Sequence, residues 1–339
     1  MKRLAILALL LFTGIGVAYA DSAPHGHVAK SLALPGDGGW DYLSVDAGRL
    51  YVAHNLVVQV IDLATDSLIG AVTGVNGAHG VAIAPDLGRG FAASGRDSAI
   101  IVFDTKTLAT LQRISLPARF PDAMCYEPKT HIVFSFNGGS ANTAAIGAAS
   151  GKLLGTIDLG GKPEFAVADG SGLVYVNNED SSYVAVVDAA KLTVRSRWPI
   201  APGQTPSGLA LDPVRHRLFS VCENKLVIVL DATNGKVLQS LPIGEGCDGV
   251  AFDTGARRAY ATNGEGTITV LREDKPGHYE VAETVPTRVG ARTVAVDPKS
   301  HRVFTATPKF GPKPEPTADR PHPRTPILPG TFEVLVVEP

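Results

Sequence analysis

A series of seven polar residues, most of them ionisable, recurs at similar intervals along the chain. Its members are Asp41, His79, Asp122, Glu164, Ser207, Asp248 and Arg292. Carboxylate oxygens are the ligands that calcium and magnesium prefer, and His79 is the one member able to act as a base near neutral pH. The series therefore predicts a divalent-cation site, if the fold brings its members together.

A second polar series lies a short distance downstream of the first. It comprises His54, Arg96, Asn137, Asn177, Glu179, Glu223 and Asn263. Amide oxygens of Asn137 or Asn177 would complete a calcium or magnesium site. The alternative interpretation is that both series are solvated polar residues lining a water-filled channel.

The elements that must position these residues belong to a repeat. One aromatic residue returns seven times, at Tyr51, Phe91, Phe134, Tyr175, Phe219, Tyr260 and Phe304. The spacings are 40, 43, 41, 44, 41 and 44 residues. A repeat of this length made of strands is typical of β-propellers.

Each repeat contains four short runs of strand length. The fifth repeat shows them clearly, as 208–212, 217–222, 225–231 and 237–242, each rich in β-branched or aromatic residues and bounded by turn residues. We therefore predict an all-β, seven-bladed propeller of four-stranded antiparallel blades. The run 27–36 resembles a fourth strand, and the last repeat stops after a third strand at 331–337. The N-terminal strand is thus expected to complete blade seven and close the ring, which hides an exposed edge.

This topology predicts where the two polar series lie. In an antiparallel blade the second and fourth strands run the same way, so the loops that follow them open on one face of the disc. Both series should therefore converge around the mouth of the central channel on that face, which we call the top. By contrast, Asp62, Asp104, Asp188 and Asp231 end third strands and are predicted to start turns by accepting backbone hydrogen bonds.

The N-terminus has the pattern of a cleavable signal peptide. Lys2 and Arg3 precede an apolar run, and Ala18-Tyr19-Ala20 forms an A-x-A cleavage site. We predict a signal peptide over 1–20, a single propeller domain over 21–339, and a periplasmic or secreted protein without a transmembrane segment. Without its two N-terminal cations the chain has 29 basic and 33 acidic residues, so nucleic acid is not an expected partner.

Two further features could bear on function. Cys222 and Cys247 are expected close together on the top face, as a candidate disulfide, whereas Cys125 should be buried and unpaired. The segment 307–330 holds eight prolines between the second and third strands of blade seven. It is either a passive loop or a lid over the channel mouth.

The repeated pattern Gly-x-Ala-x-Asp-Pro, Arg-x-Phe/Tyr-Val and Val-x-Val-x-Asp-x-x-Thr resembles the YVTN-repeat, or YncE-like, β-propellers. The stretches GDGGWDYLSVD, HGVAIAPDLGRGF and GGKPEFAVADG, which carry Asp41, His79 and Glu164, look like an exported subgroup of that family. The resemblance runs from about Gly36 to the C-terminus and implies a propeller fold, but no defined activity.

Two classes of function remain open. The favoured one is a binding or scaffold protein, expected to be a monomer, that recognises a small molecule or an envelope protein at the channel mouth. The alternative is a metal-dependent hydrolase, by analogy with lactonase-type propellers. The sequence has no H-E-x-x-H, G-x-S-x-G or P-loop motif. Any catalytic residues are therefore expected at the channel mouth.

Overall fold

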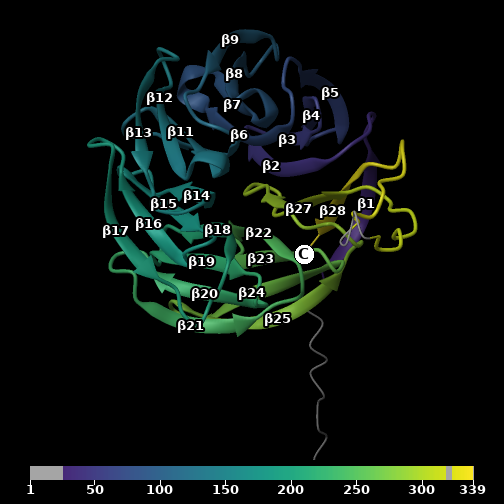
Figure 1. Cartoon of the computed structure of the whole chain (residues 1–339). Coiled ribbons are helices and arrows are strands. Elements are labelled where there is room, and N and C mark those ends of the chain that lie inside the picture. The colour runs from purple at the N-terminus through teal and green to yellow at the C-terminus, as the bar shows by residue number, and fades with distance from the viewer. Residues whose placement is uncertain (1–25, 318–322, 339) are drawn as a thin grey trace, which may run out of the picture.

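Seven antiparallel sheets of four strands radiate from a central axis (Figure 1). This computed structural model describes residues 26–317 and 323–338, so the predicted signal peptide lies outside the described residues. The sheets confirm the predicted seven-bladed β-propeller. The first strand of each blade is innermost and the fourth forms the outer rim.

The strands follow the repeat in chain order. Blades one and two contain β2 (Trp40–Asp46), β3 (Arg49–His54), β4 (Val57–Asp62), β5 (Ser67–Val72), β6 (Ala78–Ala84), β7 (Arg89–Ser94), β8 (Ala99–Asp104) and β9 (Thr110–Ser115). Blades three and four contain β10 (Pro121–Glu127), β11 (Ile132–Asn137), β12 (Asn142–Gly147), β13 (Leu153–Asp158), β14 (Pro163–Ala168), β15 (Leu173–Asn178), β16 (Tyr183–Asp188) and β17 (Thr193–Pro199). Blades five and six contain β18 (Pro206–Asp212), β19 (Arg217–Cys222), β20 (Leu226–Asp231), β21 (Val237–Pro242), β22 (Cys247–Asp253), β23 (Arg258–Asn263), β24 (Thr267–Lys275) and β25 (His278–Pro286). Blade seven contains β26 (Val294–Val296), β27 (Val303–Thr307), β28 (Glu333–Glu338) and β1 (His27–Ala33).

The hydrophobic core lies between neighbouring blades. All seven second-strand aromatic residues are buried, because the middle strands of a propeller blade have a neighbouring sheet on both faces. Phe219 illustrates the packing: its ring stacks on Phe252, with 5.3 Å between centroids, and meets the edge of Tyr279 at 4.7 Å. The aromatic repeat therefore marks the layers that hold adjacent blades together.

The ring is closed as predicted, by β1 pairing antiparallel with β28 from His27↔Glu338 to Ala33↔Glu333. Ion pairs tie this closure to blade one, since Lys30 contacts Asp66 and Arg302 Nη1 lies 2.9 Å from the same carboxylate. Asp66 of blade one thus contacts two parts of blade seven, the N-terminal strand through Lys30 and the turn before β27 through Arg302.

The acids that end third strands form turns, as predicted. Asp62 Oδ1 accepts hydrogen bonds from the backbone N–H groups of Ala64 and Thr65, at 2.9 and 3.0 Å. Asp104, Asp188 and Asp231 accept equivalent bonds from residues two or three positions ahead. These hydrogen bonds hold the pKa of all four carboxyls below the ordinary value, although for Asp231 partial burial is a larger and opposing influence.

Helical structure in the described ranges consists of three single-turn 3-10 helices, η1 (Pro85–Leu87), η2 (Gly95–Asp97) and η3 (Gly138–Ser140). None of these helices has the length and apolar character needed to cross a membrane.

Candidate functional site

A β-bulge recurs in the first strand of six blades, at the position of the first polar series. In β2, Trp40 pairs with His54 and Leu43 with Val52, so that two residues, Asp41 and Tyr42, face one on β3. Equivalent register shifts contain His79, Asp122, Glu164, Ser207 and Asp248. Because a bulge bends the strand and redirects its side chains, the polar residues leave the ladder and turn to the channel mouth.

The residue after each polar position lies deeper in the channel. Gly80 and Gly208 have no room for a side chain, since a Cβ atom on Gly80 would lie 2.5 Å from the carbonyl oxygen of Asp122, and Gly249 is tightly enclosed. These glycines let the inner strands of neighbouring blades lie close to one another. The space that remains is filled by Tyr42 and Phe165, whose ring centroids are 5.0 Å apart. The channel mouth is therefore a cup with an aromatic floor.

Three residues of the cup form a tight cluster. His79 Nδ1 is hydrogen-bonded to Asp41 Oδ2 and lies 3.3 Å from Asp122 Oδ1. One ligand atom from each residue lies within 4.8 Å of the other two. Asp122 is 8% exposed, and its Oδ1 is buried without a well-aligned hydrogen bond. A buried carboxylate oxygen without a satisfactory donor is costly unless a cation is at hand.

The protonation states in this cluster are interdependent. Burial raises the pKa of Asp41 to about 6, with the negative charge of Asp122 adding to the increase and the hydrogen bond with His79 opposing it. Burial lowers the pKa of His79, but hydrogen bonds with Asp122 and Asp41 and their charges outweigh burial and raise that pKa to about 10. His79 is thus an imidazolium at neutral pH, acting as the counter-ion of two carboxylates.

A second group surrounds Glu164. Its Oε1 accepts a hydrogen bond of 3.4 Å from the Tyr42 hydroxyl, and its Oε2 lies 3.1 Å from Lys162 Nζ, which also pairs with Glu179. Burial, followed by the charge of Asp122, raises the pKa of Glu164 to about 8, although Lys162 opposes the increase. Glu164 therefore carries a proton at neutral pH beside the ionised cluster.

Arg292 closes the opposite side of the cup. Its Nε is 2.7 Å from Asp248 Oδ2, and an Nη2 hydrogen bond of 3.3 Å reaches the backbone carbonyl of Trp40. The guanidinium also lies over the Trp40 ring, 4.6 Å from its centroid, a favourable cation–π geometry. Burial raises the pKa of Asp248, while the charge of Arg292 counteracts the increase.

The structure brings together six members of the first polar series, but Ser207 faces the backbone. The Ser207 hydroxyl donates to the carbonyl oxygen of Cys247 at 3.2 Å. Two side chains at the mouth, Lys162 and Trp40, were absent from the predicted set. Their positions beside Glu164 and Asp41 in the sequence are the only signal that could have indicated them.

The second polar series does not converge at the mouth, apart from Glu179. Asn137, Asn177 and Asn263 are buried and bond within or between blades, as in the 2.9 Å bonds from Asn177 Nδ2 to the carbonyls of Ser207 and Gly208. The amides of Asn137 and Asn263 bond side chains of their own blades, whereas that of Asn177 satisfies backbone carbonyls of the next blade.

The other three members of this series also lie apart from the cluster. His54 is buried, with its ring stacked on Phe332 at 4.0 Å and its Nδ1 3.1 Å from Gln59. Burial lowers the pKa of His54, so its imidazole is neutral at neutral pH. Arg96 extends toward Asn55, at 3.5 Å, and Glu223 is exposed.

The predicted disulfide is not formed, although its two cysteines are neighbours. All three cysteines are free thiols. Cys247 Sγ is directed at the backbone carbonyl oxygen of Cys222, 3.0 Å away, and Cys222 Sγ is directed at that of Ser220. Both thiols are buried, which raises their pKa values to about 12. Cys125 is half-buried and free, and burial raises the pKa of its thiol as well.

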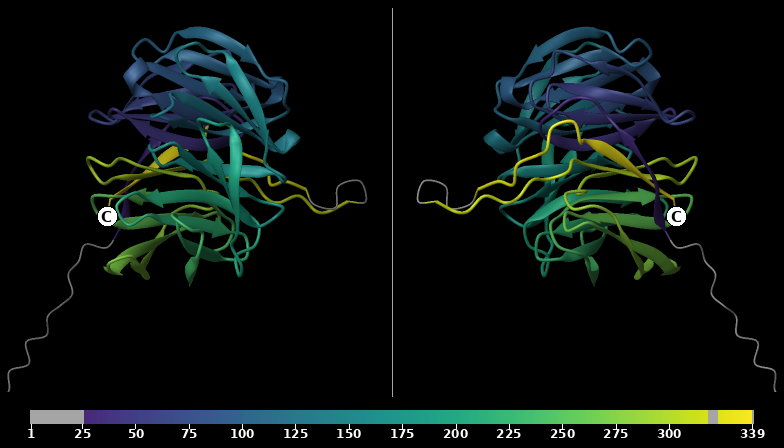
Figure 2. Two further views of the ribbon diagram at one scale, coloured as in Figure 1. Left: turned by 90° about the vertical axis from the view of Figure 1, so that its left-hand side faces the viewer. Right: turned by 90° about the vertical axis from the view of Figure 1, so that its right-hand side faces the viewer.

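The described part of the proline-rich segment forms a hairpin beside the mouth. Phe310 and Ile327 form a bridge, and backbone hydrogen bonds link Gly311 to Pro326 and Leu328 to Lys309, both at 2.9 Å. Figure 2 shows this segment projecting from a face of the disc. The Phe310 ring lies 6.1 Å from that of Trp40, so the hairpin packs against the rim of the cup.

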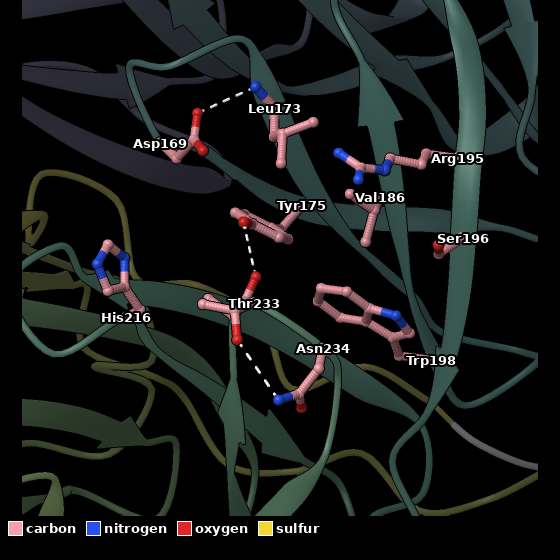
Figure 3. A pocket seen from close by; sticks show the side chains of 11 residues that line it. Asp169, Leu173, Tyr175, Val186, Arg195, Ser196, Trp198, His216, Thr233 and Asn234 are labelled. Atoms are coloured by element: carbon pink, nitrogen blue, oxygen red, sulfur yellow. Dashed lines mark hydrogen bonds between the residues drawn. The ribbon is translucent and has the colours of Figure 1, made fainter.

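A separate groove lies between blades four and five and has a volume of about 840 Å³, including the part open to solvent. Figure 3 shows Tyr175, Trp198 and His216 along it, with Tyr175 hydrogen-bonded to the backbone of blade five. It includes the turn after the third strand of blade five, which lies on the face away from the mouth. No member of either polar series lines this groove, and the site chemistry is concentrated at the mouth.

Comparisons with known proteins support the fold alone. Neither a family model nor a curated protein matches the chain. Similar solved structures include a chain of Kuenenia stuttgartiensis hydrazine synthase, with a TM-score of 0.68 and 16% identity over 78% of this chain and 91% of that one. A chain of the mitotic checkpoint complex has a TM-score of 0.75 and 12% identity, covering 100% and 99%. U3-55K has a TM-score of 0.74 and 9% identity, covering 92% and 99%. These identities are too low to transfer a function.

Proposed function

We propose that this protein is an exported, YncE-like binding protein that recognises its ligand at the channel mouth through a divalent cation. Asp41, His79 and Asp122 would hold the cation. The observation that carries the proposal is the juxtaposition of three ligand atoms, one each from Asp41, His79 and Asp122, within 4.8 Å of one another. The propeller fold is compatible with a binding or scaffold role in general.

The donor set fits a divalent ion of the first transition row at least as well as calcium or magnesium. Two carboxylates suit magnesium, calcium and manganese, whereas an imidazole nitrogen also suits manganese and zinc. Since His79 is protonated in the metal-free protein, Nδ1 must lose its proton before it can serve as a ligand. The aromatic floor of Tyr42 and Phe165 would keep the bound ion at the top of the channel.

The test is a thermal-shift titration of chelator-treated protein with calcium, magnesium, manganese and zinc. A cation at about 100 times its Kd should stabilise the wild type by about 2.7 kcal/mol. Asp122→Asn should lose most of this response while making the metal-free protein no less stable, because it relieves repulsion among buried carboxylates. Glu223→Gln, an exposed carboxylate on the same face, is the matched control and should respond as the wild type does. Equal responses of wild type and Asp122→Asn to every cation would refute the cation site.

A hydrolase is the second candidate, and Glu164 is the observation that favours it. A carboxyl with a pKa of about 8 beside a cation site has the protonation state of a general acid at neutral pH. Aryl-ester and lactone hydrolysis should then require the divalent cation and fall at least about tenfold in Glu164→Gln. Hydrolysis that is absent from the cation-loaded wild type would leave binding as the function.

Export is tested independently of the site. The mature N-terminus is expected at Asp21, because Ala18 and Ala20 supply the small residues of a cleavage site. N-terminal sequencing of protein recovered from outside the cytoplasm checks this, and an intact Met1 there would contradict it.

A further inference from the structure

A second cavity lies next to the cup, between its rim and the proline-rich hairpin. Its volume is about 920 Å³, including the part open to solvent. Three of its lining residues are cations, Arg292, Lys313 and Arg324, and none is a carboxylate. The cavity is therefore electropositive, although it adjoins a cup in which carboxylates outnumber cations.

Two of these cations are available to a ligand. Arg292 is already paired with Asp248. Lys313 and Arg324 are exposed, and within the described ranges neither makes an ion pair or a side-chain hydrogen bond. They come from the two legs of the hairpin, so an anion between them would meet a positive charge from each leg.

The other walls of the cavity are apolar and aromatic. Trp40 and Phe310 contribute their rings, and Ile327 lies opposite Phe310 across the hairpin bridge. Trp40 is 7% exposed, and its indole Nε1 is buried without a hydrogen-bond acceptor. Arg292 covers the Trp40 ring and holds it in place.

We propose that this hairpin cavity binds a small organic anion with a planar, apolar body. The carboxylate of such a ligand would lie between Lys313 and Arg324, and its planar body would pack against Phe310 and Trp40. Apolar walls with a few convergent polar groups are the usual composition of a small-molecule site. The proposal does not require a cation in the cup, because none of the three cluster residues lines the hairpin cavity.

The intrinsic fluorescence of Trp40 provides the measurement. The chain has two tryptophans, Trp40 and Trp198, so Trp198→Phe makes Trp40 the sole reporter. Titration with benzoate, in the presence of a chelator, should change this fluorescence saturably. Benzamide, which has the same shape without the charge, should bind at least about tenfold more weakly, because it lacks the charge-assisted contacts.

The variant Lys313→Ala/Arg324→Ala, in the Trp198→Phe background, should weaken benzoate binding by at least about tenfold. Lys152→Ala/Lys236→Ala is the control for overall charge, since both lysines are exposed and lie outside the cavity, and it should bind benzoate as the parent does. A benzoate response that is absent below about 10 mM, equal to that of benzamide, or unchanged in Lys313→Ala/Arg324→Ala would overturn the proposal. Because chelator is present, none of these outcomes depends on the cation site.

Discussion

At the scale of single residues, the cup places more carboxylates together than its cations neutralise. His79 is the counter-ion of Asp41 and Asp122, Arg292 that of Asp248, and Lys162 that of Glu179. Burial, followed by the charge of Asp122, raises the pKa of Glu164 to about 8, so that Glu164 holds its proton. An arrangement of this kind reduces stability unless something binds to it, and that is the physical basis for proposing the mouth as a binding site.

The cysteines provide a prediction at this scale. Titration of the denatured, unreduced protein with a thiol reagent should find three thiols per chain, because Cys125, Cys222 and Cys247 are all free in the structure. Burial and a raised pKa keep Cys222 and Cys247 as thiols rather than reactive thiolates. A value of one thiol per chain would mean that Cys222 and Cys247 are oxidised to a disulfide after all.

At the scale of strands and blades, an ion pair with a buried carboxylate connects blades five and six on the face away from the mouth. Glu273, on β24, accepts hydrogen bonds from Arg215 Nε at 3.0 Å and from the backbone N–H of Gly277 at 2.7 Å, and it also pairs with Arg257. Its side chain is 8% exposed. Because Arg215 belongs to blade five and Glu273 to blade six, this carboxylate fixes the two blades relative to each other.

The pH dependence of this link has a definite sign. Burial opposes ionisation of Glu273, but the hydrogen bonds with Arg257, Gly277 and Arg215 outweigh it and lower its pKa from 4.5 to about 2. A depressed folded-state pKa adds stability that is present above pH 4.5 and is lost as the pH falls toward 2. We expect Glu273→Gln to cost about 2 kcal/mol at pH 7 and to make stability less sensitive to pH in this acidic window.

Chemical denaturation at several pH values checks this expectation. Glu280→Gln is the matched control, since Glu280 is a half-exposed partner of Arg272 in the same blade, and surface pairs contribute little. If the two variants lost stability equally, or if Glu273→Gln kept the acid sensitivity of the wild type, Glu273 would not be the group responsible.

At the scale of the whole molecule, the ring depends on one strand from the N-terminus. Strand β1 covers the edge of β28, and its removal would expose that edge and eliminate the Lys30 contact to blade one. A chain that begins at residue 26 keeps the whole of β1 and the hydrogen bond from Gly26 to Glu283, and it should be as stable as the full chain. A chain that begins at residue 34 should melt at least about 5 °C lower and aggregate more readily.

Differential scanning calorimetry and light scattering on the two truncated chains measure this effect. The prediction fails if both chains melt at the same temperature and remain monodisperse, because β1 would then contribute nothing to ring closure.

The sequence by itself determined the architecture, because the properties that specify a propeller are local and repeated. The seven buried aromatic residues, the turn-forming acids such as Asp62, and the displaced N-terminal strand could all be identified from pattern and spacing. The recurrence of the first polar series near the start of each inner strand also predicted that its members lie close together, as Asp41, His79 and Asp122 do.

Only the tertiary structure decided which side chains contact one another at the channel mouth and which of them are protonated. The bulges at Asp41 and its equivalents depend on pairing with the second strand. The amide of Asn177 bonds the backbone carbonyls of Ser207 and Gly208 in the adjacent blade. Likewise, the aromatic floor, the free thiol of Cys247 and the cavity under the hairpin are formed by residues from different blades. Such contacts join residues at least 25 positions apart in the chain, such as Cys222 and Cys247, and local sequence patterns carry no information about them.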